Sequence, residues 1–219
     1  MTERRILAVK ALLFALCLLP LAWYTWRFQQ DALGANPIEA VTRGMGLWAL
    51  RFLLITLTVT PARKLTRQAW LGRLRRMLGL FTFFYAGLHL TTYVWFDQFF
   101  DWTAIAKDIL KRPFITAGMA AFALLVPLAA TSTNAMVRRL GGRRWQELHR
   151  TVYAIAMIGV LHFWWMVKLD TREPALYAVI VAVLLGLRLW WREQERRRQV
   201  AGAYAPKRPG RVIPISSRR

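Results

Sequence analysis

The chain is poor in several features on which soluble enzymes and nucleotide-binding proteins depend. It has one cysteine, Cys17, so it can form neither an intramolecular disulfide nor a cysteine-based metal cluster, and Cys17 is interpreted as a small apolar side chain. It has no glycine-rich phosphate loop and no dinucleotide-binding fingerprint, so we expect no nicotinamide site of its own. Acidic residues are scarce, 11 against 32 Lys and Arg, and the resulting net charge of +21 requires an explanation.

Hydrophobic residues, in contrast, make up 56% of the chain and are gathered into long runs. Apolar runs of about 18 or more residues predict transmembrane helices. The sequence therefore predicts an all-α integral membrane protein, a six-transmembrane-helix bundle that forms one domain over residues 1–191. The predicted spans are Ile6–Trp26, Gly44–Thr60, Met77–Phe96, Phe114–Thr131, His149–Val167 and Pro174–Trp191.

The basic residues are distributed unevenly over the connections between these runs. Residues 63–76 and 138–144 are rich in arginine, whereas residues 97–112 carry both signs of charge. By the positive-inside rule, this alternation places both termini in the cytoplasm. The net charge is thus interpreted as a topology signal with an attraction to anionic lipid, and we expect no nucleic acid as a partner. Residues 192–219 are expected to form a basic, disordered cytoplasmic tail.

Two of the three histidines are predicted to lie at one depth in the membrane. His89 precedes the outer end of its span by about 12 Å and His162 by about 9 Å, at about 1.5 Å per residue. A histidine in a membrane span is costly and generally functional, and two at equal depth suit axial ligation of one haem iron. Interhelical hydrogen bonds and a proton relay are the alternatives, although a relay usually includes acids and these spans contain essentially none.

Other candidate residues surround this pair. Gly87 and Gly159 would let a flat macrocycle approach the helix backbones. Arg51 is predicted near the same depth, where a haem propionate or a cofactor phosphate would neutralise it, unless it snorkels or binds backbone carbonyls. His149 lies 13 residues before His162, roughly 20 Å nearer the cytoplasm, and is a possible further metal ligand or simply an interfacial residue.

Several blocks of the sequence carry a resemblance to known proteins. The helix pattern, with one histidine on the third span and two on the fifth, resembles the ferric-reductase-like transmembrane superfamily. The closer resemblance is to the MsrQ family, the haem-binding membrane subunits of bacterial methionine sulfoxide reductase systems. It rests on GLWALRFLLITLTVTP (46–61), RRMLGLFTFFYAGLHLTTY (75–93), KRPFITAGMAAF (111–122), TSTNAMVRRLGGRRWQELHRTVY (131–153) and LHFWWMVKLD (161–170).

The resemblance implies a multi-pass protein of the bacterial inner membrane that contains haem b and FMN. It implies that electrons come from the quinone pool or a cytosolic flavin reductase. They would pass to a periplasmic molybdopterin methionine sulfoxide reductase, which repairs oxidised proteins. The chain would then be an electron-transfer subunit and not the catalytic subunit.

One position departs from the pattern of the oxidase relatives, which carry a second histidine where this chain has Arg75. The resemblance therefore implies one well-ligated outer haem, between His89 and His162. His149 would mark an inner station. Arg75 could bind a flavin phosphate there, or could be a topology charge.

The working hypothesis is a haem relay whose partner docks on residues 27–43, 97–112 and 168–173. Two alternatives remain open at this point. One is a stand-alone membrane reductase of metal ions or oxygen, which would need an open haem face. The other is a haem-free scaffold or transporter in which the histidines pack or carry protons.

Overall fold

The structure is a computed structural model that describes residues 2–167 and 169–203, and the regular elements within those residues are helical. In chain order they are α1 (Glu3–Gln29), α2 (Pro37–Thr66), the 3-10 helix η1 (Ala69–Arg73), α3 (Arg75–Thr92), the π-helical turn η2 (Tyr93–Asp97), α4 (Trp102–Lys111), α5 (Pro113–Ala130), α6 (Asn134–Leu140), α7 (Gly142–His149), α8 (Val152–Met166) and α9 (Arg172–Ala203).

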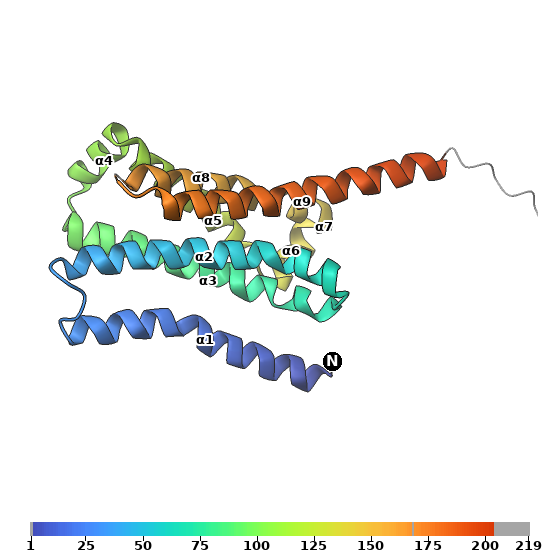
Figure 1. Cartoon of the computed structure of the whole chain (residues 1–219), viewed down its shortest axis with the longest axis horizontal. Coiled ribbons are helices and arrows are strands. Elements are labelled where there is room, and N and C mark those ends of the chain that lie inside the picture. Colours follow the sequence, from blue (N-terminus) through green and yellow to red (C-terminus); the bar gives the residue numbers. More distant parts are fainter. Residues whose placement is uncertain (1, 168, 204–219) are drawn as a thin grey trace, which may run out of the picture.

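The long helices run between the same two ends of an elongated bundle (Figure 1). We call one the α4 end, which carries α4 and the α1–α2 connection. The other is the α7 end, which carries α6, α7 and the start of α1. α9 ends beyond the α7 end, so both ends of the described chain lie on that side (Figure 1).

Five helical segments are long and apolar enough to cross a membrane, which confirms the all-α membrane class. They are Glu3–Gln29, Pro37–Thr66, Ala69–Asp97, Pro113–Ala130 and Arg172–Ala201. The remaining predicted span, His149–Val167, contains the 15-residue α8. At about 1.5 Å per residue α8 is about 22 Å long, because a turn at Arg150 and Thr151 separates it from α7.

α2 and α9 extend beyond the spans that hydropathy predicts, because polar residues stabilise the added turns. α2 begins at Pro37, where the side chain of Asn36 accepts a hydrogen bond from the backbone N–H of Glu39. α9 continues past Trp191, and Glu193 forms ion pairs within one turn of the helix. Residues 192–203, expected in a disordered tail, are therefore helical, and residues 204–219 lie outside the described part.

Two apolar clusters form the core. One joins α2, α5, α8 and α9 through residues such as Leu50, Ile155 and Val181, and the other joins α1, α2 and α3 through residues such as Met45 and Tyr85. Many large apolar side chains on the outside of the bundle are exposed. Such a surface is expected of helices that face lipid.

Tyr85 attaches α1 to the rest of the bundle. Its hydroxyl donates to the carbonyl of Cys17 at 2.7 Å and accepts from the backbone N–H of Leu21 at 3.2 Å. These two groups would otherwise bond one another across one helical turn. The hydroxyl is thus inserted into the α1 hydrogen-bond ladder next to Pro20, a known cause of helix kinks.

Candidate functional site

The structure brings His89 of α3 and His162 of α8 together near the α4 end. Their ring centroids are 6.1 Å apart and their planes lie at 71° to one another. Two metal–nitrogen bonds of about 2 Å, with about 1 Å from each nitrogen to its ring centre, separate axial imidazole centroids by about 6 Å. The observed spacing therefore fits two imidazoles that bind one metal ion from opposite sides.

Each of these imidazoles is held by the main chain. His89 Nδ1 lies 2.8 Å from the carbonyl oxygen of Thr42, and His162 Nδ1 lies 2.7 Å from that of Phe114. A carbonyl oxygen only accepts, so Nδ1 is the protonated nitrogen and Nε2 keeps its lone pair. Metal-bound histidines usually have this arrangement, because it fixes the tautomer and the orientation of the ring.

Glycines make room for both rings. A Cβ atom at Gly46 would lie 3.0 Å from His89 Cε1, and one at Gly118 would lie 3.0 Å from His162 Cε1. Gly46 comes four residues after Thr42, and Gly118 comes four residues after Phe114. In each case the earlier residue's carbonyl binds the ring that the glycine contacts. Residues four apart share a helix face, so carbonyl and glycine form one support that occurs twice, on α2 and on α5.

The sequence predicts that Gly87 and Gly159 let a flat macrocycle approach, and the structure places Gly159, but not Gly87, among the residues that line the histidine cavity. A Cβ atom at Gly87 would have no neighbour within 4 Å among the described residues, and one at Gly159 would meet Leu50 Cδ1 at 3.8 Å. The glycines that contact the rings lie on neighbouring helices, which no pattern around the histidines themselves indicates.

The two rings border a cavity of ≈ 910 Å³, which we call the histidine cavity. Its size is at the upper end of the range for cofactor sites, about 300–1,000 Å³. Apolar side chains such as Leu50, Phe122 and Ile155 line part of it. An amphiphilic cofactor with an apolar ring system and carboxylates, such as haem, fits this lining. The charged residues that line it come from the α4 end: Arg43, Asp97, Arg112, Asp170, Arg172 and Glu173.

Arg51 does not have the place expected from the sequence. Its Nε donates to the Tyr177 hydroxyl at 2.9 Å, its guanidinium lies 3.9 Å from Glu173, and it stacks over the Trp48 ring. The described residues that line the histidine cavity do not include Arg51. The carboxylate paired with Arg51 is therefore one of the protein's own, Glu173 at the start of α9.

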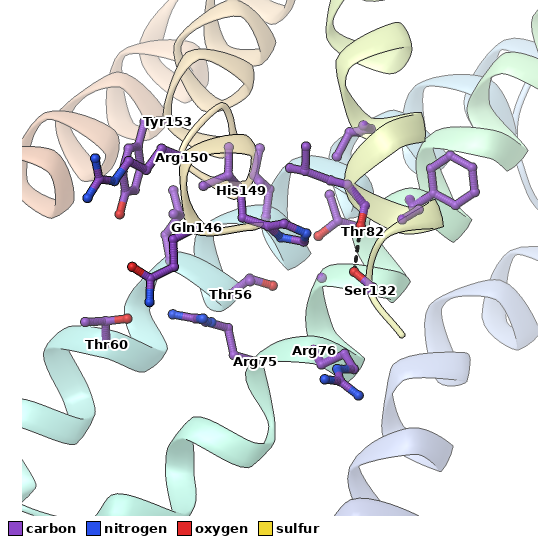
Figure 2. Close-up of a pocket in the computed structure, with 18 of the residues that line it drawn as sticks. Thr56, Thr60, Arg75, Arg76, Thr82, Ser132, Gln146, His149, Arg150 and Tyr153 are labelled. Atoms are coloured by element: carbon purple, nitrogen blue, oxygen red, sulfur yellow. Dashed lines mark hydrogen bonds between the residues drawn. The ribbon is translucent and has the colours of Figure 1, made fainter. Parts of the chain in front are cut away.

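A second cavity of ≈ 420 Å³ lies near the α7 end, and we call it the arginine cavity. Figure 2 shows Arg75 rising from the start of α3 toward Gln146 of α7, and His149 of α7 lines the same cavity. Hydroxyl and amide groups add hydrogen-bonding capacity to the wall. Its polar lining residues are Thr56, Thr60, Arg75, Arg76, Thr82, Ser132, Gln146, His149, Arg150, Tyr153 and Arg188.

His149 is engaged differently from the other two histidines. Its Nε2 lies 3.0 Å from the Thr131 hydroxyl, which is itself 2.6 Å from the Pro127 carbonyl. The single hydroxyl proton goes to the carbonyl, so His149 Nε2 is the donor and cannot bind a metal in this state. The ring also stacks on Trp145 at 3.9 Å between centroids.

The arginine cavity is electropositive because its arginines have few anionic partners. Burial, and then the nearby guanidinium groups of Arg75 and Arg76, lower the pKa of His149, which favours the neutral imidazole. Arg75 therefore shares a cavity with His149, as the resemblance implies for an inner station. Several guanidinium groups around one space suit an anionic ligand such as a phosphate.

Arg188 of α9 joins this cavity to the fold. Pro61 of α2 has no N–H, so the carbonyl of Leu57, one turn earlier, lacks its helical donor. The Arg188 guanidinium donates to that carbonyl and to the carbonyl of Leu184. Arg188 lies inside the predicted span Pro174–Trp191, and an arginine inside a membrane span is a sequence signal that could have identified it as a candidate residue.

The two cavities are neighbours. Leu53, Thr82 and Leu125 line both of them. Phe83, on the arginine cavity, stacks on Phe122, on the histidine cavity, with ring centroids 5.5 Å apart. One layer of side chains therefore separates a site suited to a metal from a site suited to an anion.

The chain is similar in sequence to known membrane proteins. A family model described as "Ferric reductase like transmembrane component" matches residues 45–160, a range that includes His89 and His149 and ends just before His162. No solved structure matches the chain.

Relatives named "Protein-methionine-sulfoxide reductase heme-binding subunit MsrQ" match most of the chain. The protein from Azospira oryzae is 57% identical over 90% of this chain and 83% of its own length. Those from Herminiimonas arsenicoxydans and Ralstonia nicotianae are 55% and 52% identical, over 88% and 92% of this chain and 89% and 94% of their own lengths.

Proposed function

The chain belongs to the MsrQ family of ferric reductase-like membrane proteins, and on this premise we propose that it is a haem-binding electron-transfer subunit of a methionine sulfoxide reductase system. The observation that carries the proposal is the facing pair of His89 and His162, 6.1 Å apart, beside a cavity of ≈ 910 Å³. Bound haem b would supply a one-electron carrier whose iron has stable ferric and ferrous forms.

The protein's part is to hold and orient that cofactor. The carbonyls of Thr42 and Phe114 each accept a hydrogen bond from Nδ1 of one histidine. The Nε2 lone pair, on the other side of the ring, is left free to bind the iron. If His89 and His162 both bound the haem iron, they would leave it no free site for oxygen or another substrate. This favours an electron relay over a stand-alone reductase, and carbon monoxide binding to the reduced protein would contradict it.

The topology that fits this function has six spans, with α8 as the fifth, and both termini in the cytoplasm. Support comes from α8, which packs beside α5 and α9 between the same two ends of the bundle (Figure 1). Arg63, Arg75 and Arg144 lie in segments at the α7 end, as the positive-inside rule requires of the cytoplasmic side. The membrane would be the bacterial inner membrane, and reporter fusions to each terminus test the orientation.

The electron acceptor would be a periplasmic molybdopterin methionine sulfoxide reductase, which repairs oxidised proteins. It would dock at the α4 end, over residues 27–43, 97–112 and 168–173, of which residue 168 lies outside the described part. The histidine cavity opens among charged residues of these segments, including Arg43 and Asp97. Crosslinking from residues in 97–112 to the partner would test this placement.

The electron donor would act at the α7 end and would be the quinone pool or a cytosolic flavin reductase. FMN would bind in the arginine cavity, with its phosphate near Arg75 and with His149 in the wall and not on a metal. The proposal is supported by the cluster of guanidinium groups around ≈ 420 Å³. Arg75→Gln should lower the flavin content of the purified protein about tenfold while haem content stays the same.

A reduced-minus-oxidised visible spectrum of the purified chain, with haem and flavin quantified, tests the function. We expect a low-spin b-type signal and close to one haem per chain. About two haems per chain would show that the arginine cavity also binds haem. A folded chain without haem, from cells with ample haem supply, would leave the scaffold alternative.

A further inference from the structure

Thr42 carries a buried hydroxyl that the fold leaves without a partner. The residue is 9% exposed and lines the histidine cavity. Its Oγ1 forms no hydrogen bond with any of the described residues. A buried hydroxyl in this state costs free energy unless a ligand or water completes it.

The other threonines of the bundle show that this state is unusual. Within a helix, a threonine can donate to the carbonyl one turn earlier and so satisfy itself. Thr58 does this in the same helix as Thr42, with Oγ1 2.9 Å from the Leu54 carbonyl. Thr56, Thr66, Thr82 and Thr131 make the equivalent bond. The Thr42 hydroxyl has the same local option and does not use it.

Arg112 supplies a charge at the same cavity. Its Nε lies 3.3 Å from Asp108, whose other oxygen accepts from the Tyr93 hydroxyl at 3.2 Å. This pairing uses Nε, and within the described residues no hydrogen bond is made by the two terminal amino groups. A guanidinium that is oriented on one edge and open on the other is suited to a carboxylate.

These two residues belong to the two supports of the histidine pair. The Thr42 carbonyl holds His89, and Arg112 lies two residues before Phe114, whose carbonyl holds His162. Both residues line the histidine cavity, so a cofactor bound there by both histidines would lie in the space that they border. The cavity is also lined by three acids, Asp97, Asp170 and Glu173, which would repel the carboxylate of a ligand. Hydrogen-bond donors such as Thr42 and Arg112 are therefore needed to bind that carboxylate.

We propose that Thr42 and Arg112 form a carboxylate clamp that binds the haem propionates, so that the propionate edge of the cofactor faces the α4 end. The clamp rests on the proposed function, since it presumes haem in the histidine cavity. It sets the rotation of the macrocycle about the axis between the two imidazoles, which the imidazoles alone leave free.

The test compares haem with haem dimethyl ester, in which both propionates are blocked. The full chain is purified in detergent from haem-depleted cells, and both compounds are titrated by absorbance. We expect the wild type to prefer haem over the ester. Thr42→Val and Arg112→Gln should each reduce that preference about tenfold, the effect of losing one hydrogen bond to a charged group.

Matched variants separate the clamp from general effects on the fold. Thr42→Ser keeps the hydroxyl and should keep the preference, and Thr58→Val removes a hydroxyl that satisfies itself elsewhere on α2 and should also keep it. An unchanged preference in Thr42→Val would overturn the clamp while haem binding stands. A wild-type chain that binds neither compound would overturn the haem assignment, and the clamp with it.

Discussion

At the α4 end, two imidazoles lie 6.1 Å apart with Nε2 unprotonated, and at the α7 end a single imidazole is bonded through Nε2 to Thr131. Side chains from α2, α3, α5 and α8 line both cavities. What differs is the group that holds each ring. A carbonyl at Nδ1 leaves Nε2 for a metal, whereas a hydroxyl at Nε2 removes it from use.

The charges follow the same division. Among the described residues, four arginines and no acids line the arginine cavity, whereas three arginines and three acids line the histidine cavity. A helix bundle can thus present a metal site and an anion site one side-chain layer apart. The presence of a histidine does not distinguish the metal site from the anion site, because all three histidines line one cavity or the other.

The largest expected effect is the loss of haem when either His89 or His162 is removed. His89→Ala or His162→Ala should reduce haem content to near zero, because an iron with one imidazole loses half of its axial ligation. Haem per chain, measured on detergent-purified protein, provides the test.

His149→Ala is the matched comparison for these variants. It should keep nearly wild-type haem content, because its ring is bonded to Thr131 and stacked on Trp145. If His149→Ala loses haem as His89→Ala does, the two cavities are not chemically distinct in the way their geometry indicates.

The glycine supports should give a smaller effect. Gly46→Ala or Gly118→Ala would place a Cβ atom 3.0 Å from a histidine ring, so the ring must shift. Changes beside metal-bound histidines lower metal affinity by roughly tenfold or more, and we expect that loss for haem in a titration.

Gly87→Ala provides the control, since its Cβ would have no neighbour within 4 Å among the described residues. It should leave haem affinity unchanged. An equal loss in Gly87→Ala and Gly46→Ala would show that the glycines act through helix flexibility and not through contact with the imidazole.

The smallest effect concerns the stability of the bundle near the arginine cavity. Arg188→Leu should lower the free energy of unfolding by about 1–3 kcal/mol, because the Leu57 carbonyl loses its donor. Pro61→Ala restores the helical N–H, so Arg188→Leu should cost less in that background. Thermal unfolding of the four proteins in detergent gives the coupling, and additive effects would contradict the role of Pro61.

Much of the fold could be predicted from hydropathy, because lipid requires long apolar helices. The helix ends could not, since polar caps such as Asn36 and ion pairs such as those of Glu193 extend helices beyond the apolar run. The connections hold α4, α6 and α7, which are too short or too polar for a hydropathy signal.

The histidine pair could be predicted because depth follows from a simple count of residues along two helices. Its supports could not, because a backbone carbonyl has no signature in a sequence. The partner of Arg51 could not either: Glu173 is distant in the chain and approaches only when α9 packs on α2.

The main-chain bonds to His89 and His162 have a consequence for how this site tolerates change. Any residue at 42 or 114 supplies a carbonyl, so substitutions there leave the bond intact. A single inserted or deleted residue between Thr42 and Leu50 would turn that carbonyl by about 100° around the helix axis relative to the packed part of α2. The two carbonyl-to-imidazole bonds should therefore survive a change of side chain at positions 42 and 114 but not a change in the length of the helices that carry them.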